Sequence, residues 1–216
     1  MRQPPAVSVH TGAFLHHHTE RAVAPLVPEI ALHLATDPRG IFYEAERIGA
    51  AHPYWAFAWP GGQGLARWLL DHPEAVAGKR VLDVGAGTAI SSIAAVMAGA
   101  TFVIANDTDP LACAAAAANA TLNRVTIEIS LGDMLDTEPD TDLILIGDLF
   151  YQPEIAARVS GFLASATRQR IPVLYADRTT AHRPPMTLEL LAGYRAPLTP
   201  AMELDYIEHC NVWRIA

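Results

Sequence analysis

The chain has 216 residues, with 15 lysine and arginine residues against 23 aspartate and glutamate residues, and a formal net charge of −8 at pH 7. This charge argues against a protein that binds nucleic acid or an anionic membrane through bulk electrostatics. The hydrophobic fraction of 51% excludes a disordered chain and indicates one domain of ordinary size with an N-terminal extension.

Sorting and cross-linking signals are also missing from the sequence. No apolar stretch is long enough to span a bilayer, and the first residues lack the pattern of a secretory signal. Cys113 and Cys210 lie far apart, so we expect neither a disulfide scaffold nor a structural zinc site. Lys79 is the only lysine, which together with alanine-rich runs is typical of a GC-rich bacterial coding sequence. We therefore expect a bacterial cytoplasmic protein.

Residues 1–26 show no clear periodic pattern, and we expect a polar arm there. His16, His17 and His18 are consecutive, so their side chains do not share a helix face. No downstream residue completes a set with metal-ligand spacing, and the sequence therefore predicts no metal site.

The next segments are predicted to be helical. Apolar residues at 30, 32 and 34, with a proline and glutamate before them, predict a short helix that begins at Pro28 and is ended by the PRG run at 38–40. An aromatic cluster follows at 53–59. A second helix is predicted over 63–70, with its apolar residues on one face.

From Arg80 onward, strands alternate with helices. The predicted strands are 81–84, 102–105, 125–129, 143–146 and 172–176, and the predicted helices are 91–97, 109–119 and 153–166. Two strand-like runs within 202–215 leave no room for a helix between them and predict an antiparallel edge hairpin. We therefore expect a Rossmann-like, doubly wound, mostly parallel α/β sheet of seven strands. Residues 1–60 are expected to form an N-terminal extension and helical cap on the domain 61–216.

A glycine-rich turn, VLDVGAG at 81–87, lies between the first of these strands and its helix. Gly85 and Gly87 allow a tight turn and a close approach to a ligand, and the following helix N-terminus favours negative charge. Asp107 lies 22 residues beyond Gly85 and ends the next strand, where a carboxylate can accept both ribose hydroxyls of an adenosine. The alternative is an ordinary turn or helix-capping aspartate, equivalent to Asp109.

Two further acids follow the third and fourth strands of this series. Asp133 could accept a hydrogen bond from an adenine amine, although a structural role in its loop is nearly as plausible. Asp148 ends a central strand, and Tyr151 follows three residues later, so we predict that this pair holds a cationic amine and orients its neutral form. The alternative is that Asp148 caps the helix beginning near Pro153, from which it is five residues distant.

These motifs resemble those of the seven-β-strand methyltransferases that use S-adenosyl-L-methionine (AdoMet). Within that group, the chain is similar to the lysine methyltransferases of the electron transfer flavoprotein beta subunit over roughly residues 28–160. The specific matches are WPGGQ at 59–63 and GDLFY at 147–151. The family often has a GDPGR turn after the fifth strand, and the different run ADRTT at 176–180 puts a role for that loop in doubt.

The resemblance implies AdoMet as the cofactor and S-adenosyl-L-homocysteine as its product. It implies a set of cofactor-binding residues: Asp83, Gly85 and Gly87 around the methionine part, Asp107 at the ribose, Asp133 near adenine, and Trp59 at the methionine end near the acceptor. It also implies Asp148 and Tyr151 as catalytic residues and the flavoprotein beta subunit as the protein substrate. For Trp55, core packing is favoured over contact with the substrate.

Three other functions remain open from the sequence. The acceptor could be another protein lysine, such as one in a ribosomal protein, or a small-molecule amine. A nicotinamide dehydrogenase is disfavoured because Ile90 replaces the third glycine of the dinucleotide fingerprint. A non-catalytic AdoMet-binding regulator is disfavoured because both Asp148 and Tyr151 are present.

Overall fold

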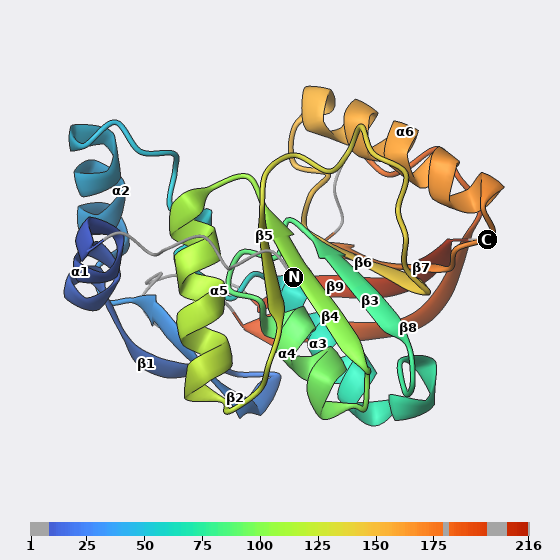
Figure 1. Cartoon of the computed structure of the whole chain (residues 1–216), viewed down its shortest axis with the longest axis horizontal. Coiled ribbons are helices and arrows are strands. Elements are labelled where there is room, and N and C mark those ends of the chain that lie inside the picture. The colour runs from blue at the N-terminus through green and yellow to red at the C-terminus, as the bar shows by residue number, and fades with distance from the viewer. Residues whose placement is uncertain (1–8, 179–181, 198–206, 216) are drawn as a thin grey trace.

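The computed structural model describes residues 9–178, 182–197 and 207–215, and its centre is a seven-stranded sheet (Figure 1). The strand order is β5-β4-β3-β6-β7-β9-β8. The strands are β3 (Arg80–Val84), β4 (Phe102–Asp107), β5 (Glu128–Leu131), β6 (Leu143–Gly147), β7 (Val173–Arg178), β8 (Leu188–Pro197) and β9 (Ile207–Ile215). Strands β3 to β7 are parallel, and β9 is antiparallel to both of its neighbours. The predicted α/β fold class is therefore confirmed.

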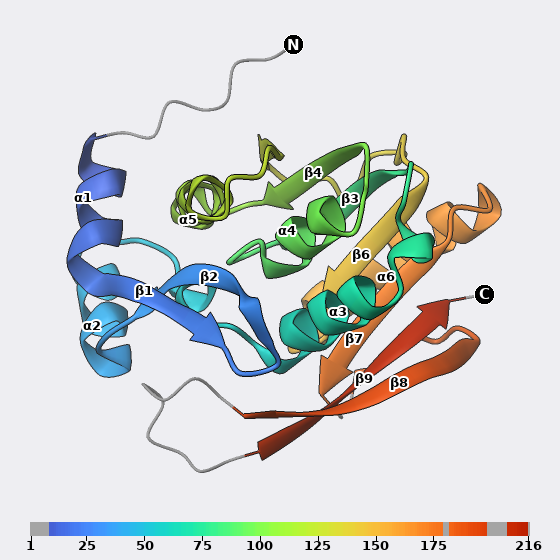
Figure 2. The ribbon, with the colours of Figure 1, turned by 90° about the horizontal axis from the view of Figure 1, so that it is seen from below.

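Helices cover both faces of this sheet (Figures 1 and 2). The helices α3 (Pro60–Asp71), α4 (Ile90–Met97) and α5 (Pro110–Leu122) lie on one face, and α6 (Pro153–Arg168) lies on the other. A single turn of 3-10 helix, η2 (Pro73–Ala75), follows α3. Because successive side chains of a strand point to opposite faces, strands buried on both faces read as continuous apolar runs, as predicted.

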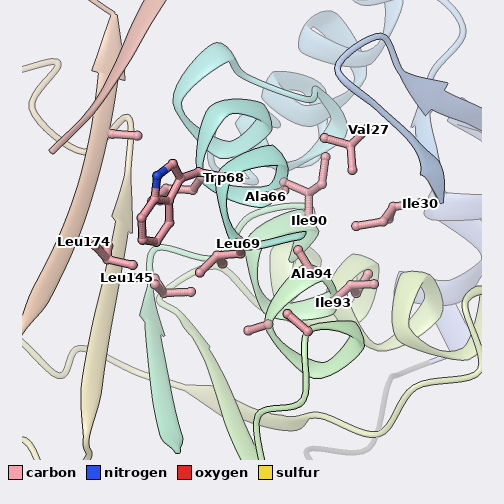
Figure 3. Packing of buried hydrophobic residues seen from close by; sticks show 14 of the residues in the cluster. Val27, Ile30, Ala66, Trp68, Leu69, Ile90, Ile93, Ala94, Leu145 and Leu174 are labelled. Atoms are coloured by element: carbon pink, nitrogen blue, oxygen red, sulfur yellow. The ribbon is translucent and has the colours of Figure 1, made fainter. Parts of the chain in front are cut away.

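The larger core lies between the sheet and the pair α3 and α4. Figure 3 shows Leu69 of α3 beside Leu145 and Leu174 of the sheet, and Ile93 of α4 on the side facing Ile30. All five side chains are buried. Each such side chain contributes about 1.5–3 kcal/mol relative to an exposed position. This packing fixes α3 and α4 against the sheet.

The N-terminal segment differs from the prediction at residues 28–40. The expected helix is wrong, because this stretch is the strand β2 (Val27–Ala35), paired antiparallel with β1 (Thr19–Ala24). The apolar residues at 30, 32 and 34 alternate with a period of two, which is the period of a strand. A helix, α2 (Pro38–Arg47), instead begins where one was expected to end, because Asp37 accepts a hydrogen bond from the Arg39 amide and Pro38 occupies the first helical position.

The polar arm expected over residues 1–26 is also wrong in its described part. Residues 9–18 form the helix α1 (Val9–His18), which leads directly into β1, and residues 1–8 lie outside the described residues. Leu15 is buried in a cluster with Trp55 and Leu111, so a contact distant in sequence stabilises a helix without a clear local pattern. A 3-10 turn, η1 (Tyr54–Ala56), completes this part.

The C-terminal edge hairpin is present, although its first strand lies upstream of the predicted position. It consists of β8 and β9, and the predicted run at 202–206 lies outside the described residues. The remaining predicted strands and helices are confirmed, with ends shifted by up to three residues, as at β5, which begins at Glu128 rather than 125. Among the described residues, none of the helices has both the length and the apolarity to span a bilayer.

Candidate active site

The glycine-rich turn connects the carboxyl end of β3 to the N-terminus of α4. Gly85 and Gly87 have φ angles of +68° and +52°, in the left-handed region that favours glycine. A Cβ atom on Gly85 would lie 2.6 Å from a methyl carbon of Leu149, so a larger residue would force that side chain to move. The Ala86 amide donates a hydrogen bond to the Asn106 carbonyl at 2.9 Å, which fixes the turn beside β4.

Asp107 lies against this turn, at the end of β4. Its Oδ2 accepts a hydrogen bond from the Gly87 amide at 3.0 Å, and its Oδ1 accepts one from the Asp109 amide at 3.1 Å. Burial raises the pKa of the Asp107 carboxyl above its usual range. The capping role belongs to Asp109, which accepts a hydrogen bond from Leu111 at the start of α5. The structure therefore brings Asp107 and Gly87 together and leaves the helix cap to its neighbour.

Asp83 is enclosed within the fold. The Ser92 hydroxyl of α4 donates a hydrogen bond of 2.6 Å to its Oδ2, and Asp83 is only 3% exposed. Burial raises the pKa of this carboxyl to about 7. The side chain therefore joins β3 to α4 beneath the glycine turn.

Asp133 lies in the loop after β5 and is paired with a cation of α6. Its Oδ2 accepts a hydrogen bond from Arg158 at 2.6 Å, and its Oδ1 accepts one from the Leu135 amide at 3.0 Å. The Arg158 hydrogen bond lowers the pKa of the Asp133 carboxyl. The loop remains close to Asp107, because the Gly132 amide donates to the Asp107 carbonyl at 2.9 Å.

Asp148 follows β6 and faces the N-terminus of α3. Its Oδ2 accepts a hydrogen bond from the Gly62 amide at 3.1 Å, and its own amide donates to the Ala176 carbonyl at 3.0 Å. The backbone at Asp148 has a φ angle of +53°, a conformation that costs energy for a residue with a side chain. The alternative role as the cap of α6 is wrong, since Gln152 occupies that position.

The second carboxylate oxygen of Asp148 is the notable feature of the site. Oδ1 is buried and has no hydrogen-bond partner among the residues that the structure describes. Burial, followed by the charge of Asp177, raises the pKa of Asp148 to about 7. An unsatisfied buried carboxylate oxygen is costly in a folded protein, and a donor from a ligand would relieve this cost.

Aromatic side chains from the segment before α3 meet Tyr151. The Trp59 indole donates a hydrogen bond to the Tyr54 carbonyl at 2.8 Å, and the two rings are 6.0 Å apart. The Tyr54 and Tyr151 rings are 5.9 Å apart, and these tyrosines are 41% and 44% exposed. Trp55 is only 2% exposed, which confirms the prediction of core packing. The aromatic surface of Tyr54, Trp59 and Tyr151 is therefore accessible to a ligand.

Two residues of this site were missed in the sequence. Asp177 and Arg178 end β7, and the backbone pairing of Gly147 with Ala176 places Asp177 next to Asp148. The Arg178 guanidinium lies 5.8 Å from the centre of a Trp59 ring. The available signal was that both residues directly follow the apolar run predicted as a strand over 172–176. Thr179 and Thr180 of the same loop lie outside the described residues.

The histidine run forms the last turn of α1. Within residues 9–178, 182–197 and 207–215, no group of three histidine, cysteine, aspartate or glutamate residues is arranged to hold a metal ion.

Comparison with known proteins gives a consistent family. Residues 68–147 match the ribosomal protein L11 methyltransferase (PrmA) family. The human electron transfer flavoprotein beta subunit lysine methyltransferase is 45% identical over 149 residues, which cover 67% of this chain and 56% of the human protein. The zebrafish (Danio rerio) protein of the same name is 38% identical over 197 residues, covering 88% of this chain and 76% of that protein.

The chain belongs to the family of electron transfer flavoprotein beta subunit lysine methyltransferases. It spans little more than half the length of the human member. Among solved structures, a proposed RNA methyltransferase from Pyrococcus horikoshii matches with a TM-score of 0.56 and 19% identity, covering 76% of this chain and 86% of that protein. This second likeness supports the fold alone. The match to the ribosomal protein L11 methyltransferase family includes both the glycine turn and the strand that precedes Asp148.

Proposed function

We propose that this protein transfers methyl groups from AdoMet to lysine ε-amines of the electron transfer flavoprotein beta subunit. The observation that carries this proposal is the buried, unpartnered Oδ1 of Asp148, whose other oxygen accepts from the Gly62 amide at the N-terminus of α3. A carboxylate so placed suits a cationic amine that brings hydrogen-bond donors with it. The names of the human and zebrafish relatives supply the acceptor.

The residues around the glycine turn fit AdoMet. Gly85 and Gly87 leave the backbone open to a ligand, and the Asp107 carboxylate lies beside Gly87. In this proposal the Asp107 carboxylate accepts hydrogen bonds from the ribose hydroxyls. In this proposal Asp83 supports the methionine end from beneath the turn, and Trp59 borders that end. When bound, AdoMet supplies an electrophilic methyl group, so the protein has mainly to position the acceptor.

Asp133 is proposed to border the adenine. It is only loosely enclosed, because it is 39% exposed at its side chain and paired with Arg158. In this role the carboxylate would keep its ion pair and use its remaining acceptor capacity for the adenine amine.

Deprotonation of the acceptor is the chemical problem at the other end of the site. A lysine ammonium has a pKa near 10.4, so only about one molecule in a few thousand is neutral at pH 7. We propose that Asp148 binds the ammonium and directs the amine. Tyr151 and Trp59 exclude water around it, which favours the neutral form. Alignment of the amine nitrogen with the transferred methyl group then accounts for most of the rate as a proximity effect.

Residues 1–60 are proposed to form an extension and cap on the methyltransferase domain 61–216. Two kinds of contact support this division. Leu15 of α1 packs in the same cluster as Leu111 of α5, and backbone groups of β2 bond to side chains of α5. Tyr54, near the end of the proposed cap, contributes to the aromatic surface beside Tyr151.

The direct test is mass spectrometry of purified flavoprotein beta subunit after incubation with this protein and AdoMet. We expect methyl groups on lysines of the subunit. The Asp148→Asn variant should lower kcat by about 10²-fold or more, as expected when the group that positions the acceptor amine is lost. The matched control is Asp71→Asn, which changes a carboxylate at the far end of α3, where it pairs with Arg67. Wild-type turnover in Asp148→Asn would contradict the role of Asp148.

A second candidate acceptor is a ribosomal protein lysine, because residues 68–147 match the ribosomal protein L11 methyltransferase family. The same assay should therefore include purified L11 and a small-molecule amine. Methylation of either one, with an unmodified flavoprotein subunit, would overturn the proposed acceptor and retain the proposed chemistry.

A further inference from the structure

Asp177 is a second carboxylate beside Asp148, and the reaction as described above does not use it. It is only 4% exposed and ends the strand that neighbours β6. The Asp148 amide bonds to the Ala176 carbonyl at 3.0 Å, so the two acids are held on adjacent strands by the backbone itself. The backbone positions of the two acids are therefore fixed by the pairing of β6 with β7.

A tyrosine hydroxyl fixes Asp177. Tyr175 donates a hydrogen bond of 2.9 Å to Asp177 Oδ2, and its ring is 1% exposed and packs edge-on against Phe150. A donor to a carboxylate favours the ionised form of that carboxylate. Because the Tyr175 ring is buried in the core, its hydroxyl oxygen is held next to Asp177.

Other groups face Asp148 from the elements packed around it. From α3 come the backbone amides of Gly61 and Gly62, and from β7 comes Arg178, and all of these favour the ionised carboxylate. From β9 comes the Cys210 thiol, which is neutral because burial, with the charge of Asp148, raises its pKa to about 12. Asp177 opposes ionisation, since two buried carboxylates side by side resist carrying two negative charges.

We propose that Asp177, fixed by Tyr175, is a positioning residue that acts through Asp148 and makes Asp148 the acceptor of the proton that the substrate ammonium must lose. This inference rests on the proposed function. In the step, an N–H bond of the ammonium breaks and its proton passes to Asp148 Oδ1. The amine lone pair then forms the N–CH₃ bond while the S–CH₃ bond breaks, and that electron pair remains on sulfur. Asp148 afterwards releases the proton to water.

The pKa of Asp148, raised to about 7, suits this task because a base is most effective when its pKa is near the working pH. An aspartate with the usual pKa would bind the ammonium but would be too weak a base to accept the proton of that ammonium. Burial is the larger cause of this increase and the neighbouring Asp177 carboxylate adds to it, so Asp177 strengthens Asp148 as a proton acceptor.

The first experiment titrates the Asp148 carboxyl carbon by ¹³C NMR in the protein without any acceptor. Wild type, Asp177→Asn and Tyr175→Phe are compared at pH 5–9. We expect the Asp148 titration in Asp177→Asn to move to lower pH by roughly one pH unit, because a neighbouring negative charge is removed. Tyr175→Phe keeps the core ring and should lower the protonated fraction of Asp148 at pH 6, because Asp177 then competes better for the shared proton. Asp71→Asn should leave the titration unchanged.

The second experiment measures kcat/KM for methyl transfer across the same pH range. The acid limb of the Asp177→Asn profile should move with its Asp148 titration, and its plateau should be lower because the base is weaker. The proposal is overturned if both variants leave the Asp148 titration where the wild type has it, or move it to higher pH. Because the NMR titration needs no acceptor, its result tests the effect of Asp177 on Asp148 even if the flavoprotein subunit is not the substrate. If Asp177→Asn fails to fold, Tyr175→Phe decides the outcome.

Discussion

Asp107 and Asp109 lie two residues apart and have different roles, which makes them a matched pair for mutation. Asp107 accepts from the Gly87 amide, whereas Asp109 caps α5. We expect Asp107→Ala to weaken AdoMet binding about 10- to 100-fold, because hydrogen bonds to a charged group contribute about 1.5–3 kcal/mol. Calorimetry with AdoMet measures this change, and circular dichroism checks the fold.

Asp109→Ala is the control for that prediction. It should lower the free energy of unfolding by about 1 kcal/mol through loss of the helix cap and leave AdoMet affinity within about twofold. Equal AdoMet affinity in Asp107→Ala and the wild type would show that the Asp107 carboxylate does not contact the ribose.

At the scale of elements, α5 connects the N-terminal hairpin to the glycine turn through two asparagines. Asn119 is fully buried, and it accepts from the His33 amide at 2.7 Å and donates to the Thr88 carbonyl at 2.9 Å. Asn123 makes the corresponding hairpin contacts, accepting from the Ala31 amide and donating to the Ala31 carbonyl. In the part of the chain that the structure describes, it makes no hydrogen bond to the glycine turn. Asn119 therefore supports both the hairpin and the glycine turn, whereas Asn123 supports the hairpin.

Alanine substitutions separate these two effects. Both Asn119→Ala and Asn123→Ala should destabilise the protein by about 1–3 kcal/mol, because each leaves buried backbone groups unpaired. Asn119→Ala should also raise the KM for AdoMet several-fold, since Thr88 precedes Ala89, whose φ angle of +59° needs support from its surroundings. Chemical unfolding and initial-rate kinetics measure the two quantities. An unchanged KM in Asn119→Ala would show that the hairpin and the turn are independent.

At the scale of the whole molecule, buried acids make stability depend on pH. The folded pKa of Asp83 is raised to about 7, above its value in the unfolded chain. Between these two values the folded state binds more protons, so the contribution of Asp83 to stability is fully present below about pH 4 and is lost as pH rises through about 7. The pKa of Asp148 is also raised in the folded protein, so its contribution to stability is likewise lost as pH rises.

Asp83→Asn tests this dependence. The variant removes the buried charge and retains an oxygen that can accept from Ser92. We expect the unfolding free energy of the variant, relative to the wild type, to be higher at pH 8 than at pH 5. Urea unfolding at the two pH values measures the difference. A pH-independent difference would show that Asp83 has an ordinary pKa in the folded protein.

Several features could be predicted from the sequence because their signals are local. The glycine turn follows a short apolar run directly, and the acids at 107 and 148 follow similar runs, so their placement at the carboxyl edge of a parallel sheet needs no knowledge of distant contacts. The prediction for residues 28–40 was wrong for a local reason. Three alternating apolar residues were assigned the period of a helix, whereas their period is that of a strand.

By itself, the sequence determined the α/β class, the order of strands and helices from residue 80 to the end of β7, and the glycine turn with its neighbouring acid. Tertiary structure alone decided what surrounds Asp148. Its carboxylate meets an amide 86 residues away at Gly62, and Asp177 and Arg178 approach from a third segment. The physical reason is that periodicity and turn propensity report on neighbours along the chain, whereas hydrogen bonding and charge in a buried site depend on which distant segments the packed core brings together.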